Sequence, residues 1–555
     1  MKQDIEITLN NSKKITVPYD TTIMEIVLNN SDVCQEKVIG AKIENQIVDF
    51  KRQVKKNVNI ELFGINDVDG YKMNQAGLKF VLEVALKNNY EGAEVEFNHS
   101  IGNGIHTTIK NVKFTKEDVE KLKKEMDIII EKDMIIQKLI VESKEAVEYY
   151  NKKGYQEKAM NAHNISNALL SIYKLDKYLN YFYCEMPYST GYLNDFELVY
   201  INDNELAITL PINHTFNFVE YKEYDKITEC FKRDRYLLNV YKMPYISDIN
   251  KEIAKGKSKD FIRLFETHFD NKVHEAAIMA IYEKVKYIFI AGPSSSGKTT
   301  TAKKLVLNLI SEGYETKLIS TDDYFVNKEQ SPRNPDGSYD FESIKCVDIK
   351  KLNQDLKDLI SGKEVYLPKY NFRTGQREFS EEPTKLGDKA IIVIEGIHCL
   401  NDELTPDIDN SLKYRVYLSP FMPLKIDRHN YLSTTDLRLI RRIIRDNNNR
   451  GCDISKTIEL WKGVRHGEEK NIFPYLDKAD VIINTALPYE LSVLKVFVEP
   501  LLYSVKIDSP YVEEARRLIK YLDNIYPISS EYVEEDSILR EFIGGSVFKE
   551  EGDLW

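Results

Sequence analysis

The sequence predicts an α/β protein of several domains, the last of which is built on a parallel sheet. Three observations support this class. The chain has 555 residues, and at roughly 100–200 residues per domain this length suggests about three or four domains. Residues 1–65 alternate apolar and polar positions in short runs, which is typical of half-buried strands. Residues 286–510 alternate apolar runs with helical segments, which is typical of parallel strands covered on both faces.

The composition narrows the classes of function. Hydrophobic residues make up 42% and charged residues 30% of the chain, which suits several globular cores. The 77 Lys and Arg against 88 Asp and Glu give a net charge of −11, which argues against general nucleic-acid or membrane binding. We see no secretory signal, and the apolar runs are far shorter than the ~20 residues of a membrane-spanning helix. Six scattered cysteines without a CxxC pair predict a reduced, cytoplasmic protein without structural zinc.

Residues 1–65 are expected to form the first domain. Residues 5–9 and 14–17 each predict a strand, and a polar turn separates them. An Asp-Thr-Thr segment precedes an apolar helical stretch at residues 23–28 and can cap that helix. Further short strands are expected at residues 38–43 and 58–62. A hairpin, a helix and more strands in so short a segment favour a ubiquitin-like β-grasp.

Residues 66–230 are expected to form a second domain of mixed structure. A helix is predicted over residues 76–87, and a strand with a turn over residues 95–109. A long helix is predicted from Thr115 to about residue 132. Thr115 and Asp118 have the spacing of a capping box, with Asp in place of Glu, which marks the start of that helix.

The rest of the chain divides into a connector, a sheet domain and a tail. Residues 231–285 are expected to be a helical connector. Residues 286–510 contain five apolar strands, which begin near Tyr287, Lys317, Ala390, Tyr414 and Asp480. Residues 511–555 are expected to be an acidic tail, first helical and then loop-like.

A phosphate-binding loop follows the first strand of the sheet domain. Residues 292–299 read Gly-Pro-Ser-Ser-Ser-Gly-Lys-Thr and match GxxxxGK[ST] between a strand and a helix. The glycines let backbone N–H groups approach phosphate oxygens, and the helix N-terminus adds a positive dipole end. Lys298 supplies a cation to the β- and γ-phosphates, and Thr299 supplies a hydroxyl to Mg²⁺. The motif predicts ATP or GTP as the donor, held by Gly292, Pro293, Ser294, Ser295, Ser296, Gly297, Lys298, Thr299 and Thr300.

Two other strands end in carboxylates on the phosphate side of the sheet. Glu395 follows one of them and is expected to hold Mg²⁺ together with Thr299 and Asp322. Asp322 and Asp323 follow the other. A kinase of small molecules needs a carboxylate that accepts the proton of the acceptor hydroxyl. Asp322 is our candidate for this base, with Asp323 or a purely structural turn as the alternatives.

The helix expected over residues 436–449 is rich in arginine. Arg438, Arg442 and Arg445 share one face at helical spacing, and Arg450 follows them. A solvated basic face is the alternative interpretation. Because a P-loop kinase needs movable cations around the transferring phosphoryl group, we expect this helix to act as a lid.

These residues resemble the uridine kinase and phosphoribulokinase group of P-loop kinases over residues 286–485. That group has an Asp-x-[FY]-[FY] segment with the general base, a Tyr-Asp that binds ribose hydroxyls, and a Pro-x-Tyr-x-Phe that reaches the nucleoside base. The matching stretches are Asp322-Asp-Tyr-Phe, Tyr339-Asp340, Pro368-Lys-Tyr370-Asn-Phe372, Glu395-Gly and Arg441-Arg-x-x-Arg-Asp through Arg450-Gly. The resemblance implies acceptor contacts from Asp340, Tyr370 and Phe372, and phosphate contacts from Arg442, Arg445 and Arg450.

The acceptor side departs from uridine kinases in two places. The base-reading histidine is absent from the stretch 373–377, and Leu460 stands where those kinases have a base-contacting glutamine. Arg377 is expected to contact the substrate, and the additional arginines favour a sugar phosphate as the alternative acceptor. Arg465 and His466 suit either a phosphate contact or a solvated loop.

The first 230 residues resemble the N-terminal half of threonyl-tRNA synthetases. The β-grasp is similar to a TGS domain, and the stretch 184–191 is similar to part of the editing module. That module normally carries HxxxH and CxxxH. Here residues 76–87 contain no histidine and the second motif reads Cys184…Tyr188, so we expect the editing chemistry to be lost. The combination of all these parts resembles a bacterial family of nucleoside kinases.

The expected function is transfer of the γ-phosphoryl group of ATP or GTP to the 5′-hydroxyl of a nucleoside, with Mg²⁺ as cofactor. A sugar phosphate is the alternative acceptor. A third hypothesis is an RNA- or nucleotide-responsive regulator whose synthetase-like half is the sensor, which the net charge of −11 disfavours. The expected partners are therefore a nucleotide and a small acceptor, with no membrane. A tRNA-like ligand of the N-terminal half and a homo-oligomer stay open.

Overall fold

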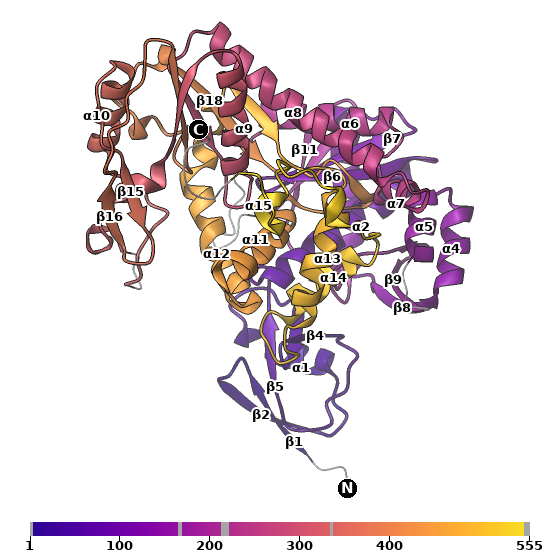
Figure 1. Ribbon diagram of the computed structural model, residues 1–555. Helices are drawn as coiled ribbons and strands as arrows, with labels where there is room; N and C mark the ends of the chain where they lie inside the picture. The colour runs from indigo at the N-terminus through magenta and orange to yellow at the C-terminus, as the bar shows by residue number, and fades with distance from the viewer. Residues whose placement is uncertain (1–3, 165–168, 212–220, 334–336, 549–555) are drawn as a thin grey trace.

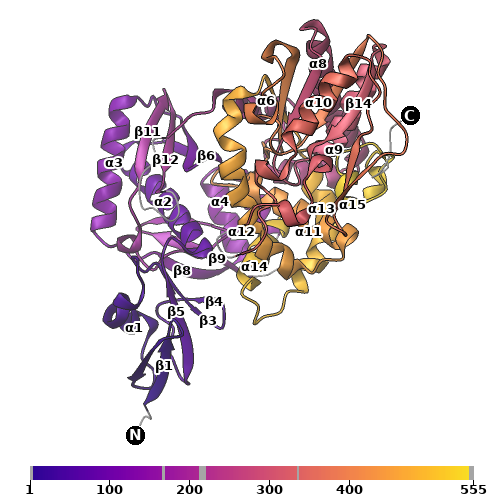
Figure 2. The ribbon, with the colours of Figure 1, turned by 90° about the vertical axis from the view of Figure 1, so that its left-hand side faces the viewer.

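The computed structural model describes residues 4–164, 169–211, 221–333 and 337–548 (Figure 1). Figures 1 and 2 show a small N-terminal sheet at one end of the molecule, a mixed α/β part beside it, and a larger body that carries the parallel sheet. Within the described ranges, every helix is too short or too polar to cross a lipid bilayer.

The N-terminal part of the chain consists of a five-stranded sheet and one α-helix. The order of the sheet is β2-β1-β5-β3-β4, and only the central pair β1 and β5 is parallel. The helix is fixed at its start by a capping box, in which Thr22 and Glu25 exchange hydrogen bonds. The elements are β1 (Ile5–Leu9), β2 (Lys13–Val17), α1 (Ile23–Asn30), β3 (Gly40–Ile43), β4 (Gln46–Val48) and β5 (Val58–Phe63).

The middle part contains a four-stranded antiparallel sheet in the order β11-β12-β7-β6, packed with two long helices. The helix expected over residues 76–87 begins already at Val68, because the Asp67 carboxylate accepts the first free N–H groups. These elements are α2 (Val68–Asn89), β6 (Glu94–Ile101), β7 (Gly104–Lys110), α3 (Lys116–Glu131), β11 (Glu197–Asn202) and β12 (Glu205–Thr209).

A smaller three-stranded sheet and three connecting helices complete the middle part. The sheet has the order β10-β9-β8 and packs with α4 and α5. The elements are β8 (Gln137–Glu142), α4 (Ser143–Lys152), α5 (Gln156–Asn164), β9 (Leu169–Leu175), β10 (Tyr178–Asn180), α6 (Asp225–Val240), α7 (Ile246–Ala254) and α8 (Ser258–Tyr282).

The body is built on a five-stranded sheet in the order β14-β17-β13-β18-β21. Every neighbouring pair is parallel, which confirms the predicted parallel sheet. Apolar cores lie on both faces of the sheet, so the central strand β13 is buried along its whole length. The strands are β13 (Tyr287–Ala291), β14 (Glu315–Ser320), β17 (Ala390–Glu395), β18 (Lys413–Ser419) and β21 (Val481–Asn484).

Helices and two hairpins surround this sheet. The helices are α9 (Lys298–Ser311), α10 (Ile349–Ile360), α11 (Thr434–Arg450), α12 (Ile454–Asn471), α13 (Glu490–Tyr503), α14 (Val512–Leu522) and α15 (Arg540–Ile543). The first hairpin is β15 (Pro368–Asn371) with β16 (Gln376–Phe379), and the second is β19 (Lys425–Asp427) with β20 (Asn430–Tyr431).

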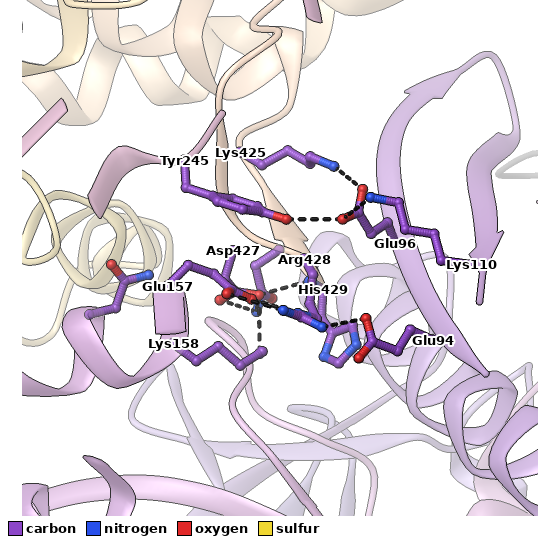
Figure 3. A network of polar contacts seen from close by, with 12 residues as sticks. Glu94, Glu96, Lys110, Glu157, Lys158, Tyr245, Lys425, Asp427, Arg428 and His429 are labelled. Atoms are coloured by element: carbon purple, nitrogen blue, oxygen red, sulfur yellow. Dashed lines mark hydrogen bonds and ion pairs between the residues drawn. The ribbon is translucent and has the colours of Figure 1, made fainter. Parts of the chain in front are cut away.

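The second hairpin, residues 425–431, is held by the middle part through a buried polar network (Figure 3). Lys425 Nζ lies 2.5 Å from Glu96 Oε2, and Arg428 pairs with Glu157 at 2.6 Å and with Glu94 at 2.7 Å. These charges are largely buried, so each depends on its partner for stabilisation. Since α11 starts at Thr434, directly after this hairpin, the middle part anchors the start of the arginine-rich helix.

Candidate active site

The predicted phosphate-binding loop lies between β13 and α9, at the carboxyl end of the central strand. Ser295 and Gly297 adopt left-handed backbone conformations, with φ of 60° and 83°. Gly297 is required here for a second reason, because an added Cβ would overlap the side chain of Ile538. The loop therefore turns sharply enough to present the first N–H groups of α9 to a ligand.

Two carboxylates and a hydroxyl from different elements meet beside Lys298. The Thr299 hydroxyl donates to Glu395 Oε1 at 3.4 Å, at the end of β17. Burial raises the pKa of Glu395 to about 7; Lys298 opposes this rise, while Asp322 and Glu541 add to it. Burial also raises the pKa of Asp322, again against Lys298. The structure thus brings together four of the residues that the sequence predicted, from β13–α9, β14 and β17.

This set of oxygen donors suits a hard divalent cation. Thr299 offers a hydroxyl and Glu395 a carboxylate within hydrogen-bond distance of each other, and the charge of Asp322 acts on Glu395. Mg²⁺ is usually bound in proteins by one or two carboxylates together with phosphate oxygens. Among the described residues, no group of three His, Cys, Asp or Glu side chains is suited to a metal ion.

The structure separates the two candidate bases by their partners. Asp323 Oδ1 accepts a hydrogen bond of 3.3 Å from the backbone N–H of Tyr370 and so fixes the first hairpin. Asp322 lies in the turn after β14, where its N–H donates to the Ser320 hydroxyl at 3.4 Å. Burial raises the pKa of the Asp322 carboxyl, and the nearby charge of Lys298 opposes this rise. This difference favours Asp322 as the residue that acts on a substrate.

Helix α11 lies over the phosphate-binding loop through its arginines. Arg442 Nη1 and Arg445 Nη2 donate to the Ser294 hydroxyl at 3.2 and 3.4 Å. Arg442 also pairs with Asp446 at 3.1 Å. The side chain of Arg450 lies outside the described residues. The two arginines at Ser294 are therefore next to the phosphate position, as the lid prediction requires.

Two further arginines of α11 are buried in ion pairs. Arg438 donates to the Ser294 carbonyl at 2.9 Å and pairs with Glu468 of α12. Arg441 belongs to the family-like arginine stretch but had no predicted role; it pairs with Glu490 at 2.8 Å and is fully buried. Glu468 and Glu490 are far from these arginines in the sequence, so the helical spacing of the arginines could not predict their structural ion pairs. Through these contacts Arg438 and Arg441 fix α11 to the phosphate-binding loop and to its neighbouring helices.

The predicted acceptor residues lie between β14 and β17, with Asp340 in a loop and with Tyr370 and Phe372 in the β15–β16 hairpin. Tyr370 is buried and packs edge-on against Phe325 and Phe372, with ring centroids 5.6 and 5.0 Å apart. The Phe372 side chain is 67% exposed, so it is accessible to a substrate. The Asp340 carbonyl accepts from the Cys346 thiol at 3.1 Å, which leaves its carboxylate available. These three residues are compatible with an acceptor pocket.

Two arginines near the predicted acceptor residues are paired with carboxylates of the protein. Arg377 pairs with Asp348 at 2.9 Å. Arg465 lies on helix α12 and not on a loop, and it pairs with Glu468 at 3.4 Å and with Glu469 at 3.5 Å. These carboxylates neutralise positive charges that a phosphorylated acceptor would need for its own binding.

Glu342 is a carboxylate at this site that the sequence did not single out. Its carbonyl accepts from Asn471 Nδ2 at 2.8 Å, and Gly467 of α12 leaves room for its side chain. Burial raises the pKa of Glu342 to about 7, with Glu468 and Asp322 adding to the rise, while Lys298 and Arg442 oppose it. Glu342 therefore places a second carboxyl group beside the reaction centre, one whose charge depends on pH near neutrality.

Two histidines of the middle part lie in an aromatic stack. His99 and His106 are opposite each other on β6 and β7 and stack at 4.6 Å, with Phe231 on the other face of His99 at 4.0 Å. The thiol of Cys184 instead contacts the Lys72 carbonyl at 3.6 Å. Both histidines are buried in an aromatic stack, which lowers their pKa values through desolvation.

Comparisons with known proteins agree with the kinase motifs. The model of the phosphoribulokinase/uridine kinase family matches residues 287–491. A uridine kinase of Macrococcus caseolyticus is 33% identical over 202 residues, which cover 36% of this chain and 88% of that protein. A uridine kinase of Schizosaccharomyces pombe is 33% identical over 224 residues, which cover 40% of this chain and 44% of that protein. A possible uridine kinase from Bacillus stearothermophilus, a solved structure with 21% identity, covers 36% of this chain and 89% of that chain with a TM-score of 0.24.

Proposed function

Because this chain belongs to the phosphoribulokinase/uridine kinase family, we propose that it transfers the γ-phosphoryl group of ATP or GTP to a hydroxyl of a neutral acceptor, most plausibly the 5′-hydroxyl of a nucleoside. One observation carries the proposal. Lys298, Thr299, Asp322 and Glu395 come from three neighbouring strands and meet at one edge of the sheet, beside the arginines of α11. This is the arrangement that phosphoryl transfer needs.

In the proposed reaction the loop and α9 bind the donor phosphates through backbone N–H groups, and Lys298 neutralises their charge. Asp322 takes the proton of the acceptor hydroxyl, whose oxygen forms a bond to the γ-phosphorus as the bond to the β,γ-bridging oxygen breaks. Burial raises the pKa of Asp322 and so makes it a stronger base. The products are a phosphorylated acceptor and a nucleoside diphosphate.

The lid and the metal site stabilise the charge that moves in this reaction. Arg442 and Arg445 already lie at Ser294, from where they reach the transferring group and exclude water. Thr299, Glu395 and Asp322 would hold Mg²⁺, which neutralises charge on the phosphate oxygens when it is bound. We extend the lid role to Arg450 on the family resemblance.

The charges around the acceptor position support a neutral acceptor over a sugar phosphate. Arg377 and Arg465 are engaged by carboxylates of the protein, and Glu342 adds negative charge beside Asp322 at a pH above its pKa of about 7. A phosphorylated acceptor would be repelled by these carboxylates. Hydroxyl groups are donors that carboxylates accept well, so Asp340 and Glu342 suit the vicinal hydroxyls of a ribose, with Tyr370 and Phe372 beside its base.

For the N-terminal half we propose a TGS-like β-grasp over residues 1–65 and an editing-like domain over residues 66–230 without editing activity. The strand order β2-β1-β5-β3-β4 with a parallel central pair supports the first. The stacking of His99 on His106, away from any metal cluster among the described residues, supports the loss of activity. Residues 231–285, 286–510 and 511–555 remain our proposed connector, kinase domain and tail.

The test is NTP-dependent phosphorylation of an acceptor panel. Uridine, cytidine, adenosine, guanosine, inosine, thymidine and ribulose 5-phosphate are offered with ATP or GTP and Mg²⁺, and Lys298→Ala serves as the control. We expect one or more nucleosides to be phosphorylated by the wild type and not by the control. Phosphorylation of ribulose 5-phosphate alone would overturn the acceptor class, and nucleotide binding without any transfer would overturn the nucleoside assignment.

A further inference from the structure

A segment near the C-terminus packs against the phosphate-binding loop. We call residues 537–543 the C-terminal segment. Ile538 and Phe542 are fully buried, and Ile538 contacts the loop at Gly297. The Phe542 ring lies 4.9 Å from the Arg441 guanidinium, and its carbonyl accepts from Asn448 Nδ2 at 3.2 Å. The segment therefore touches the nucleotide loop and the lid helix α11 at the same time.

One side chain of this segment reaches the start of α9. Glu541 Oε2 accepts from the Thr300 hydroxyl at 3.0 Å and from the Thr300 backbone N–H at 3.4 Å. The intrahelical hydrogen bonds of α9 start with the bond from Thr301 N–H to the Gly297 carbonyl. The N–H of Thr300 is thus one of the free N–H groups at the helix start.

These free N–H groups are the ones that bind phosphate oxygens in a P-loop. The Glu541 carboxylate takes one of them with an oxygen that carries the same sign of charge as a phosphate. The positive end of the helix can stabilise an anion in this place, but two anions there repel each other. A nucleotide that uses the Thr300 N–H must therefore displace the Glu541 side chain.

A cation that already lies beside Glu541 can hold the displaced side chain. Arg445 Nη1 lies 3.9 Å from Glu541 Oε1, and both side chains are 17% exposed. Rotation of the Glu541 side chain away from Thr300 leaves it within reach of this guanidinium. The backbone of the segment stays in the core, because Ile538, Leu539 and Phe542 are buried on either side of Glu541.

We propose that Glu541 is a built-in competitor of the nucleotide for the Thr300 N–H, and that nucleotide binding transfers it to Arg445 of the lid. The competition lowers the affinity for the donor. The transfer couples arrival of the donor to the position of a lid arginine. This inference rests on the proposed function, because it requires a nucleotide in the phosphate-binding loop.

The experiment measures the affinity of the full chain for ADP by isothermal titration calorimetry. Glu541→Gln keeps the shape of the side chain and removes its charge, and Glu531→Gln removes an exposed charge from the same end of the chain. We expect E541Q to bind ADP about tenfold more tightly than the wild type, since a repulsive charge at the phosphate position is gone. We expect E531Q to bind ADP as the wild type does.

If Glu541 only caps α9, E541Q will lower the melting temperature while ADP affinity stays the same or falls, and the inference is overturned. Should E541Q not fold, Glu541→Ala and Glu541→Asp are titrated instead, with tighter binding expected for the variant without charge.

Steady-state kinetics separate this inference from the proposed function. A lower KM for the donor with an unchanged KM for the acceptor supports the inference. Transfer by the wild type with an unchanged donor KM in E541Q overturns the inference alone, and absence of ADP binding in every variant overturns the proposed function as well.

Discussion

The guanidinium of Arg438 and the carboxylate of Glu468 form an ion pair between helices α11 and α12, with only 2% and 3% of their side chains exposed. Arg438 also donates to the Ser294 carbonyl in the phosphate-binding loop. The pair therefore links three elements of the active site. Because both charges are buried, the loss of one leaves the other without compensation.

We expect Glu468→Ala to lower the free energy of unfolding by about 3–5 kcal/mol, because Arg438 remains buried without its partner. The double variant E468A/R438M should recover part of this loss, since it removes both charges. Thermal melting followed by circular dichroism measures the effect. Glu469→Ala is the matched control, because Glu469 is the next residue of α12 and its side chain is 55% exposed. Equal melting temperatures for E468A and E469A would contradict the prediction.

Asp322→Asn should reduce kcat at least about 100-fold, because the acceptor hydroxyl loses its general base. Its affinity for ADP should stay within about threefold of the wild type, since Asp322 is not part of the phosphate-binding loop. Asp323→Asn is the matched control and should retain most of the activity, because Asp323 serves the backbone N–H of Tyr370. Steady-state kinetics with the accepted nucleoside measure kcat for both variants. A larger loss of kcat in D323N than in D322N would make Asp323 the general base in place of Asp322.

Glu342→Gln should narrow the preference for a neutral acceptor over a phosphorylated one. At pH 8, above the pKa of Glu342 of about 7, this change removes a negative charge beside Asp322 and lowers the repulsion of an anionic acceptor. We expect the ratio of kcat/KM values to change about tenfold. The ratio is measured for the accepted nucleoside and ribulose 5-phosphate. Glu381→Gln, an exposed change on a loop of the same domain, should leave the ratio unchanged. An unchanged ratio in E342Q would show that Glu342 does not set the acceptor charge.

Glu266 should make the stability of the protein depend on pH. Burial raises its pKa to about 7, although hydrogen bonds from Ser537 and Tyr489 lower it. The folded state therefore holds a proton between pH 4.5 and 7 that the unfolded state has released, so stability falls as the pH rises through this range, by about 3 kcal/mol in total.

Glu266→Gln carries no such proton, so its melting temperature should exceed that of the wild type at pH 8 and approach it at pH 5. Glu275→Gln, an exposed change on the same helix α8, should follow the wild type at both values. The same difference between E266Q and wild type at pH 5 and pH 8 would contradict this account of Glu266.

The parts of the site that the sequence predicted are those that depend on local order. The loop 292–299 is continuous in sequence, and Asp322 and Glu395 each follow an apolar strand directly. The carboxyl ends of parallel strands meet at one edge, so these residues come together once the sheet forms. The five strands and the arginine-rich helix were predicted for the same reason, from patterns within short windows.

The parts that could not be predicted depend on partners distant in sequence. Arg441 has the same helical pattern as a solvated arginine, and only its contact with Glu490 makes it a buried structural residue. Glu96 and Lys425 are separated by most of the chain, and neither has a local signal for an ion pair. A pattern of charges gives the residue type and the face of the helix, but it does not give the partner.

The position of residues 537–543 has a consequence for synthesis of the protein on the ribosome. The loop at residues 292–297 emerges long before the segment that packs beneath it, so a nascent chain has the nucleotide motif without Ile538 or Glu541. Since domains fold as they emerge, the N-terminal sheet and the middle part can form first. The hairpin 425–431 can then pack against the middle part through the ion pairs of Figure 3. The kinase body, in contrast, lacks the contacts of residues 537–543 until the end of translation. Until then the nascent chain has a phosphate-binding loop without the competing carboxylate of Glu541.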